Sequence, residues 1–311
     1  MATPEGILNL DKPRGLTSHD VVSRVRALTG LRRVGHAGTL DPLATGVLLV
    51  CVGRATRVAE YLMGRPKVYR AHVRLGVTTD TYDSAGQIVA QAPVEVGREQ
   101  VEVALAQFRG WITQTPPIYS ALKHQGVSLH RLARRGDDVE EIVQRKARQV
   151  EISRLELTAW EPPHGVLEVA CSSGTYVRAL AHDLGQALGC GAHLTGLTRL
   201  ASGSFLLTDA VPLERLAQAV DEARWPDLLH PIDAALSHFP ALHVDAEAAR
   251  QLCSGQAVAA SSPGILSGGE RGEEMARVYG PGALFLALVV RDLSADVWRP
   301  HKVFCQPERF G

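Results

Sequence analysis

The sequence has few aromatic residues and no long apolar run. Phe, Trp and Tyr make up 5% of its 311 residues, so any surface on which nucleic-acid bases stack must be built from isolated rings. No apolar stretch approaches the roughly 18 residues that a membrane-spanning helix needs. The first fifteen residues lack the basic start and apolar core of a secretory signal. We therefore expect a cytoplasmic protein that makes no membrane contact.

Cysteine is also scarce. The five cysteines are an odd number without paired spacing, which argues against a disulfide framework and for a reducing compartment. Cys190 and His193 have the spacing of half a zinc site, but the sequence holds no second pair of similar quality. The sequence therefore predicts neither a disulfide framework nor a bound metal.

The formal net charge is zero, since 33 Lys and Arg balance 33 Asp and Glu. A zero balance argues against a nucleic-acid partner, but the charges are unevenly distributed. Residues 12–74 carry twelve basic and three acidic residues, whereas residues 75–311 carry 21 and 28. This basic sector, residues 12–74, is suited to binding phosphates. A solvated basic surface would have the same composition, so charge alone leaves both interpretations open.

Apolar periodicity indicates a mixture of strands and helices. Residues 6–10, 46–53, 69–75 and 166–173 have the pattern of strands, and 69–75 alternates in the manner of a strand with one solvated face. One helix is expected after Thr17, which is followed three residues later by an acid, and Gly30 closes it. A second helix is expected over about residues 175–188.

Two regions depart from this pattern. The stretch 124–148 is rich in both charges and poor in apolar positions, so we expect a protruding arm there. From about residue 239, short strand-like pieces separated by glycine turns indicate a small β-barrel, with a mobile loop beginning at Ser261. The predicted domains are residues 1–238, which include the arm, and residues 239–311.

The most informative segment is a glycine-rich loop from Arg32 to Gly46, with the sequence RRVGHAGTLDPLATG. Its glycines permit tight turns and the close approach of a ligand. Pro42 restricts Asp41 to extended conformations and so fixes where its carboxylate points. A held carboxylate in a basic loop suits nucleophilic chemistry on a polyanion. On physical grounds alone, an ordinary Asp-Pro turn is the favoured explanation of the same residues.

Part of this loop, GHAGTLDPLATGVL, resembles the catalytic motif of the TruB family of pseudouridine synthases. Four further segments resemble that family in the same order, namely NLDKPRGLTS, KVYRA, QTPPIYSALK and CSSGTYVR. A last segment, GAHLTGLTRL, also fits. Together they span about residues 6–205, and chance agreement of so many ordered motifs is negligible.

The resemblance implies a fold and a reaction. The family has a mixed α/β fold of the α+β kind, in which helices flank a bent, largely antiparallel sheet and the active site occupies a central cleft. Its members isomerise uridine to pseudouridine without a cofactor, by breaking the N-glycosidic bond, turning the uracil and rejoining it through C5. The C-terminal residues resemble the small PUA-like RNA-binding β-barrel that is often attached to this family.

Three residues match catalytic positions of the family. Asp41 matches the essential acid, which acts on the base or on the ribose, and the sequence does not distinguish these roles. Arg178 matches the arginine that pairs with this acid, and a guanidinium can keep a carboxylate ionised through two hydrogen bonds. Tyr69 matches the tyrosine that stacks on the flipped uracil and is implicated in removing the C5 proton. Without the resemblance, a surface arginine and a half-buried strand tyrosine would explain the last two.

Further residues are candidates for RNA contacts. His36 matches a family histidine that enters the RNA stack near the target, and Lys12 and Leu197 match pocket residues. Arg32 and Arg33 belong to the basic sector, and we expect them to contact RNA as well. The implied substrate is uridine 55 in the T-loop of tRNA. That base must be extruded to be reached, at a cost of about a few kcal/mol.

The resemblance thus predicts the T-arm of tRNA as the partner. We expect no cofactor, no obligatory protein partner and a monomer. The nearest alternative enzyme is the guide-RNA-dependent branch of the superfamily, but the inserted arm after Lys123 and the lack of an extended basic tail favour the standalone bacterial type. An alternative of another class is an RNA-binding protein or tRNA-folding chaperone whose isomerase activity is secondary or lost.

Overall fold

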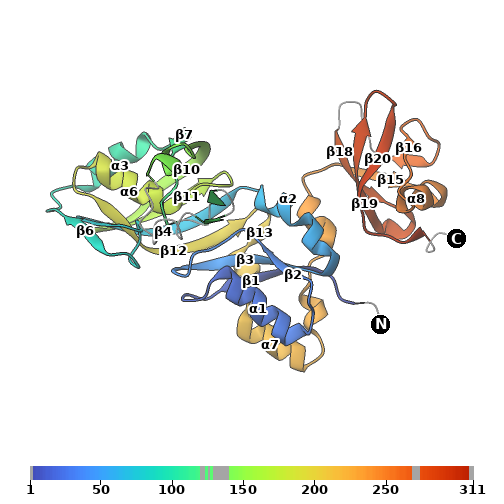
Figure 1. Cartoon of the computed structure of the whole chain (residues 1–311), viewed down its shortest axis with the longest axis horizontal. Helices are drawn as coiled ribbons and strands as arrows, with labels where there is room; N and C mark the ends of the chain where they lie inside the picture. Colours follow the sequence, from blue (N-terminus) through green and yellow to red (C-terminus); the bar gives the residue numbers. More distant parts are fainter. Residues whose placement is uncertain (1–2, 120–122, 125–126, 129–139, 268–273, 308–311) are drawn as a thin grey trace.

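The computed structural model describes residues 3–119, 123–124, 127–128, 140–267 and 274–307. Within these residues there are two main sheets, one built between residues 6 and 212 and the other between residues 241 and 303. Figure 1 shows them as two lobes that meet near α2 (Ala59–Met63). Every helix in the described part of the chain is too short or too polar to span a membrane.

The first sheet has ten strands and is largely antiparallel. Its main path runs β14-β1-β3-β12-β4-β11-β10-β7, while β2 pairs with β3 and β13 with β12. Within this sheet, the β1–β14 and β3–β12 pairs are parallel. Because β12 lies between β3 and β4, it touches the strand that follows the glycine-rich loop and the strand that carries Tyr69. The strands are β1 (Gly6–Lys12), β2 (Val34–Ala37), β3 (Ala44–Val52), β4 (Lys67–Leu75), β7 (Gly110–Gln114), β10 (Arg148–Glu161), β11 (His164–Cys171), β12 (Ala192–Ser202), β13 (Phe205–Leu206) and β14 (Val211–Pro212).

Local sequence patterns account for the elements nearest the site. In β4, the odd-numbered residues from 69 to 75 are buried and residues 70, 72 and 74 are exposed, which confirms the predicted alternation. Helix α1 (Ser18–Thr29) begins with a capping box between Thr17 and Asp20 and ends at Gly30, whose φ of 70° is left-handed. The predicted start and end of this helix are therefore both confirmed.

Helices flank the sheet at both ends. Helices α1 and α7 (Leu213–Asp221) lie side by side next to β1, and α6 (Val177–Ala187) packs on β12 while α3 (Arg98–Ala106) packs on β10 (Figure 1). Leu, Val and Ile side chains fill the space between these helices and the sheet. This arrangement confirms the predicted mixed α/β fold class and places the first turn of α6 beside the glycine-rich loop.

Shorter elements complete the first lobe. Two small sheets pair β5 (Val77–Thr79) with β6 (Ile88–Gln91) and β8 (Lys123–His124) with β9 (Val127–Ser128). About half of the predicted arm at 124–148 lies outside the described residues, and its described parts are one strand pair, α5 (Glu140–Gln144) and the residues that lead into β10. The 3₁₀ helices among the described residues are η1 (Gly53–Val58), η2 (Leu207–Asp209), η3 (Trp225–Leu228), η4 (Ile232–Leu236) and η5 (Pro281–Ala283).

The second sheet is small and curled, with the order β16-β20-β19-β18-β15-β17 and helix α8 (Ala246–Cys253) against it. Its strands are β15 (Ala241–Val244), β16 (Val258–Ala259), β17 (Ile265–Ser267), β18 (Met275–Tyr279), β19 (Phe285–Asp292) and β20 (Val297–Val303). A small β-rich C-terminal unit was predicted and is confirmed. The domain boundary at residues 238 and 239 stays a prediction.

Part of the predicted mobile loop is a strand. Residues 265–267 form β17 and pair with β15, and Ile265 packs against the core of the second sheet. The glycine-rich composition of this region concealed a short apolar stretch that completes the edge of the sheet. Residues 268–273 of the same predicted loop lie outside the described residues.

A disulfide joins Cys253 at the end of α8 to Cys305, which follows β20, and this corrects the prediction that cysteine spacing indicates no disulfide. The two residues are 52 positions apart in sequence, and their Cα atoms lie 5.6 Å apart. The spacing along the chain could not reveal the pair, because the fold of the second sheet brings the two ends together. Cys51, Cys171 and Cys190 are free and buried.

The lobes are joined by both polar and apolar contacts. Arg57 in η1 donates to the carbonyl of Val303 at 2.7 Å, and Lys302 donates to the carbonyl of Arg57 at 2.6 Å. Leu288 and Phe304 pack into the same apolar cluster as side chains of β3 and η1. These contacts with β3 and η1 therefore hold the second lobe against the first.

Candidate active site

A cavity of about 280 Å³ opens where several segments of the first lobe meet. Most of its walls come from residues 38–41 of the glycine-rich loop, from β4, from residues 172–178 and from β12, and Met63 and Arg148 complete them. Four of the predicted site residues line it, namely Asp41, Tyr69, Arg178 and Leu197. The fold therefore brings together side chains that are dispersed along more than half of the chain.

Backbone contacts on both sides hold Asp41 in place. The amide of Leu40 donates to the hydroxyl of Ser18 at 2.8 Å, and that hydroxyl donates back to the carbonyl of Leu40 at 3.1 Å. On the other side, the amide of Gly15 donates to the carbonyl of Pro42 at 2.8 Å. The first turn of α1 and the end of β1 thus fix the position from which the Asp41 carboxylate projects.

Arg178 is the cationic partner of Asp41. Its Nε lies 2.9 Å from Asp41 Oδ2, and its Nη1 lies 3.3 Å from Asp83 Oδ2. The carbonyls of Thr81 and Tyr119 each accept a further bond from the guanidinium at 3.1 Å. Only 8% of the Arg178 side chain is exposed, so these bonds fix the guanidinium inside the protein.

The pKa of Asp41 is raised above the ordinary value of 3.8, chiefly because the cavity walls desolvate the carboxylate. The ion pair with Arg178 and the charge of Lys12 oppose this rise, whereas the charge of Asp83 adds to it. The carboxylate is not sealed off, since 40% of the Asp41 side chain is exposed. The site therefore combines an accessible carboxylate with an environment that weakens its hydration.

Asp83 is a site residue that the sequence reasoning missed. Its Oδ1 accepts bonds from the hydroxyl of Thr81 at 2.7 Å and from the amide of Ala85 at 3.0 Å, and its side chain is 7% exposed. In the sequence, Asp83 lies in a Ser-Ala-Gly turn that looks like ordinary loop composition. Its role becomes visible only where the turn approaches α6 and meets Arg178.

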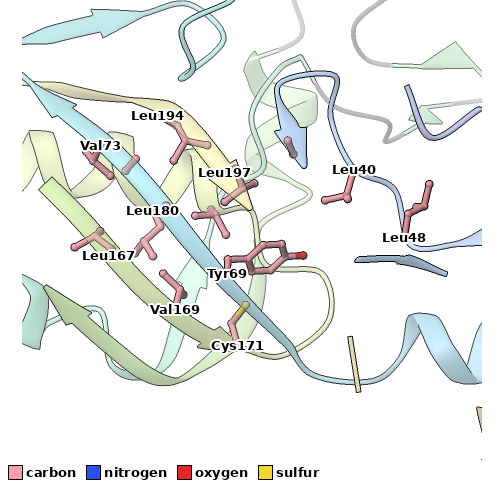
Figure 2. Close-up of a cluster of buried hydrophobic side chains, with 14 of the residues drawn as sticks. Leu40, Leu48, Tyr69, Val73, Leu167, Val169, Cys171, Leu180, Leu194 and Leu197 are labelled. Atoms are coloured by element: carbon pink, nitrogen blue, oxygen red, sulfur yellow. The ribbon is translucent and has the colours of Figure 1, made fainter. Parts of the chain in front are cut away.

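Tyr69 lies at the floor of the cavity and is 9% exposed. Figure 2 shows its ring near Leu197, with the hydroxyl directed away from Leu167 and Val169 and toward the side of Leu40 and Leu48. Burial raises the pKa of the Tyr69 phenol, while the positive charge of Arg199 opposes the rise. Near neutral pH the phenol is therefore protonated and can donate a hydrogen bond.

Lys12 does not line the cavity. It is completely buried at the end of β1, and its ammonium donates to the carbonyls of Pro13 at 3.0 Å and Leu16 at 2.6 Å. Desolvation lowers its pKa to about 8, although the charge of Asp41 partly offsets this effect. Its charge reaches the site through space, and direct contact of Lys12 with RNA stays a prediction.

The other predicted RNA-binding residues lie outside the cavity. His36 is half-buried in β2, where burial lowers its pKa and its Nδ1 has no hydrogen-bond partner among the described residues. Arg32 and Arg33 are exposed in the turn before β2, and Arg33 donates to the hydroxyl of Thr56 at 2.8 Å. None of these three residues lines the cavity, and their contact with RNA stays a prediction.

Arg148 is a second missed residue and lines the cavity at the start of β10. Its guanidinium lies 5.0 Å from the centre of the Tyr176 ring and donates to the carbonyl of Gly174. Sequence reasoning had assigned Arg148 only to the charged arm. Across the described residues, no three His, Cys, Asp or Glu side chains lie close enough together to hold a metal ion.

Two family models match consecutive parts of the chain. The model of the TruB family pseudouridylate synthase N-terminal domain matches residues 26–177, which include the glycine-rich loop and Tyr69. The model of the tRNA pseudouridylate synthase B C-terminal domain matches residues 178–237, which begin at Arg178. The two matched ranges meet at the start of α6, so the ion pair between Asp41 and Arg178 connects them.

Curated relatives and solved structures agree with these models. The tRNA pseudouridine synthase B of Syntrophotalea carbinolica is 48% identical over 92% of both chains, and that of Cupriavidus metallidurans is 45% identical over 96% of this chain and 93% of its own. A crystal structure of a Cbf5-Nop10-Gar1 complex contains a chain with a TM-score of 0.76 and 26% identity, covering 99% of this chain and 87% of that one. The chain therefore belongs to the TruB family of pseudouridylate synthases.

Proposed function

We propose that the protein isomerises uridine to pseudouridine at position 55 in the T-loop of tRNA, and that Asp41 is the catalytic carboxylate. The observation that carries this proposal is the ion pair of Asp41 with Arg178 inside a cavity whose floor is Tyr69. The relatives that share the chain's length are named tRNA pseudouridine synthase B, which supports tRNA as the substrate.

The reaction conserves all atoms of the nucleotide. The bond between N1 of uracil and C1′ of ribose breaks, the base turns, a bond forms between C5 and C1′, and the C5 proton is lost while N1 gains one. Asp41 begins the sequence by attacking the base or acting at the ribose. Arg178 holds its carboxylate ionised and oriented while the walls weaken its hydration.

Tyr69 supplies the surface on which the extruded uracil rests. Its ring and Leu197 form adjoining parts of the cavity wall, and every base has a π-face that can stack on such a ring. The raised pKa of the phenol favours stacking and hydrogen-bond donation over removal of the C5 proton. Replacing Tyr69 with Phe distinguishes these roles, because the ring stays and the hydroxyl is lost.

RNA contacts outside the cavity follow from exposed basic side chains. Arg32 and Arg33 lie on the surface before β2, and Arg148 lies at the cavity wall. Contacts with phosphates predict that tRNA affinity falls steeply as salt increases. The C-terminal sheet is a further candidate for RNA contact. We propose that the protein acts as a monomer, without an obligatory protein partner or cofactor.

The test uses unmodified tRNA transcript labelled with tritium at uridine C5, incubated with the purified protein and EDTA. We expect stoichiometric release of tritium that disappears in Asp41→Asn, while tRNA affinity stays within about tenfold, or 1.4 kcal/mol. No release by the wild-type protein, together with tight tRNA binding, would instead favour the RNA-folding chaperone.

A further inference from the structure

Arg199 is an almost completely buried cation whose bonds go to backbone carbonyls. It is 1% exposed and lines the cavity from β12. Its Nε donates to the carbonyl of Val47 at 2.6 Å, its Nη2 to that of Gly38 at 3.2 Å and its Nη1 to that of Thr39 at 3.5 Å. Removing a guanidinium from water is costly, and hydrogen bonds to these carbonyls offset that cost. The contribution of Arg199 is therefore the position in which it holds the backbone that carries them.

Two of these carbonyls belong to the loop that carries Asp41. Gly38 and Thr39 precede the carboxylate by three and two residues, whereas Val47 belongs to β3 on the far side of the loop. One side chain therefore ties the residues just before Asp41 and the strand that follows the loop to β12. A guanidinium can do this because its donors diverge in a fixed plane, and an ammonium cannot reproduce that geometry.

The same side chain lies beside Tyr69. Arg199 and Tyr69 are directly opposite each other on the antiparallel strands β12 and β4, and both residues line the cavity. In Figure 2 the hydroxyl of Tyr69 is directed away from Leu167 and Val169 and toward the side of Leu40 and Leu48. Arg199 thus lies between the loop of the carboxylate and the tyrosine of the floor.

The backbone of Arg199 has little freedom to shift. A Cβ atom added to Gly46 would lie 2.3 Å from the carbonyl oxygen of Arg199, so β3 and β12 approach more closely there than any side chain allows. The parallel register pairs Arg199 with Gly46. Because this backbone is constrained, the Arg199 side chain that extends from it can hold the loop in a fixed position.

We propose that Arg199 is a positioning residue for pseudouridine formation, which sets the separation of the Asp41 carboxylate from the Tyr69 ring by binding the loop from the position on β12 that lies opposite Tyr69. This inference rests on the proposed function. It predicts that Arg199 governs the rate at which bound RNA is converted and has little influence on how tightly RNA binds. A residue that merely stabilised the fold would lower the amount of active protein and leave the rate of the folded fraction unchanged.

The experiment measures single-turnover tritium release with enzyme in excess, together with tRNA affinity and the thermal melt of each variant. We expect Arg199→Lys to convert bound tRNA at least about tenfold more slowly, equivalent to 1.4 kcal/mol, with an affinity within about threefold of the wild type. If Arg199→Lys does not fold, Arg199→Gln is measured in its place, because its amide still donates to a carbonyl. The matched control is Arg109→Lys, since Arg109 also donates to a carbonyl, that of Leu155 at 3.0 and 2.9 Å, away from the cavity.

A double-mutant cycle with Tyr69→Phe separates positioning from stability. If Arg199 sets the position of Asp41 relative to the Tyr69 side chain, the two losses are coupled, and the loss caused by Arg199→Lys is smaller in the Tyr69→Phe background than in the wild type. The inference is overturned if Arg199→Lys leaves the conversion rate of bound RNA unchanged, or if its conversion rate and tRNA affinity fall in proportion. It is also overturned if the rate losses of Arg199→Lys and Tyr69→Phe simply multiply in the double variant. Absence of tritium release by the wild-type protein would reject the proposed function itself, so the two failures are distinguishable.

Discussion

The Nε atom of Arg178 lies 2.9 Å from the carboxylate of Asp41, while another nitrogen of the same guanidinium lies 3.3 Å from Asp83. One cation therefore serves two carboxylates that belong to different loops. Arg178 and Asp83 are almost fully buried, whereas Asp41 remains accessible from the cavity. This asymmetry leaves Asp83 to anchor the arginine and Asp41 to meet the substrate, and the predictions below follow from it.

Arg178→Lys should slow conversion far more than it weakens tRNA binding. An ammonium cannot reach both carboxylates and the two carbonyls that the guanidinium contacts. Loss of one charge-assisted bond in the reacting state, worth about 1.5–3 kcal/mol, corresponds to a rate lower by about 10- to 150-fold. Single-turnover tritium release measures the rate and filter binding measures the affinity. An unchanged rate would show that Arg178 is not needed to hold Asp41.

Asp83→Asn should lower both the conversion rate and the melting temperature. The amide keeps the shape but removes the charge that balances Arg178 in a buried site, which we expect to cost about 1–3 kcal/mol. The control is Asp80→Asn in the same turn, because Asp80 accepts a bond from the amide of Gln87 at 2.8 Å. Equal effects of the two substitutions would assign the loss to the turn and not to the pairing with Arg178.

Acid should inactivate the enzyme at a higher pH than an ordinary aspartate would predict. Conversion requires ionised Asp41, whose pKa lies above 3.8 because of desolvation, so activity is lost as pH falls through this raised pKa. The charge of Asp83 contributes to the rise, and Asp83→Asn should therefore move the acid limb to lower pH. Single-turnover rates across the acid range test both statements. An acid limb that moves to higher pH in Asp83→Asn would contradict the contribution of Asp83 to the raised pKa of Asp41.

Gly46→Ala should destabilise the first lobe strongly, and Gly30→Ala only mildly. Both glycines have positive φ, 95° and 70°, so each substitution carries a backbone penalty of about 1–2 kcal/mol. At Gly46 the new Cβ would also lie 2.3 Å from the carbonyl oxygen of Arg199, whereas at Gly30 nothing lies within 4 Å. Denaturant unfolding compares the two variants. Similar losses would mean that β3 and β12 are less closely packed than described.

The Cys253–Cys305 disulfide should leave three of the five cysteines free. A thiol titration of the denatured, unreduced protein is therefore expected to count three thiols. Reduction should weaken the C-terminal sheet, since closing a loop of this length stabilises a fold by about 4 kcal/mol in the chain-entropy picture. Five thiols before reduction, or a melt that reductant does not change, would contradict the disulfide. Cys253→Ser provides the matched comparison.

The local sequence pattern was sufficient to predict the elements that flank the site. The alternation of β4 and the capping box and glycine of α1 arise from contacts between neighbours in the chain, so sequence alone identified both. The ordered motifs also identified Asp41, Tyr69, Arg178 and Leu197 as one site, and the fold brings all four to the same cavity. Fold class and family were accessible for the same reason, because motif order is a property of the chain.

Only the tertiary structure identified the residues that support the site. Asp83 resembles an ordinary turn residue and Arg199 an ordinary strand arginine until the turn reaches α6 and β12 is placed between β3 and β4. Lys12 was expected among the pocket residues, yet its ammonium is bound by carbonyls of its own segment. Burial, register and contacts between distant segments determine these roles, because a charge acquires its partner and its pKa from the atoms that surround it in space.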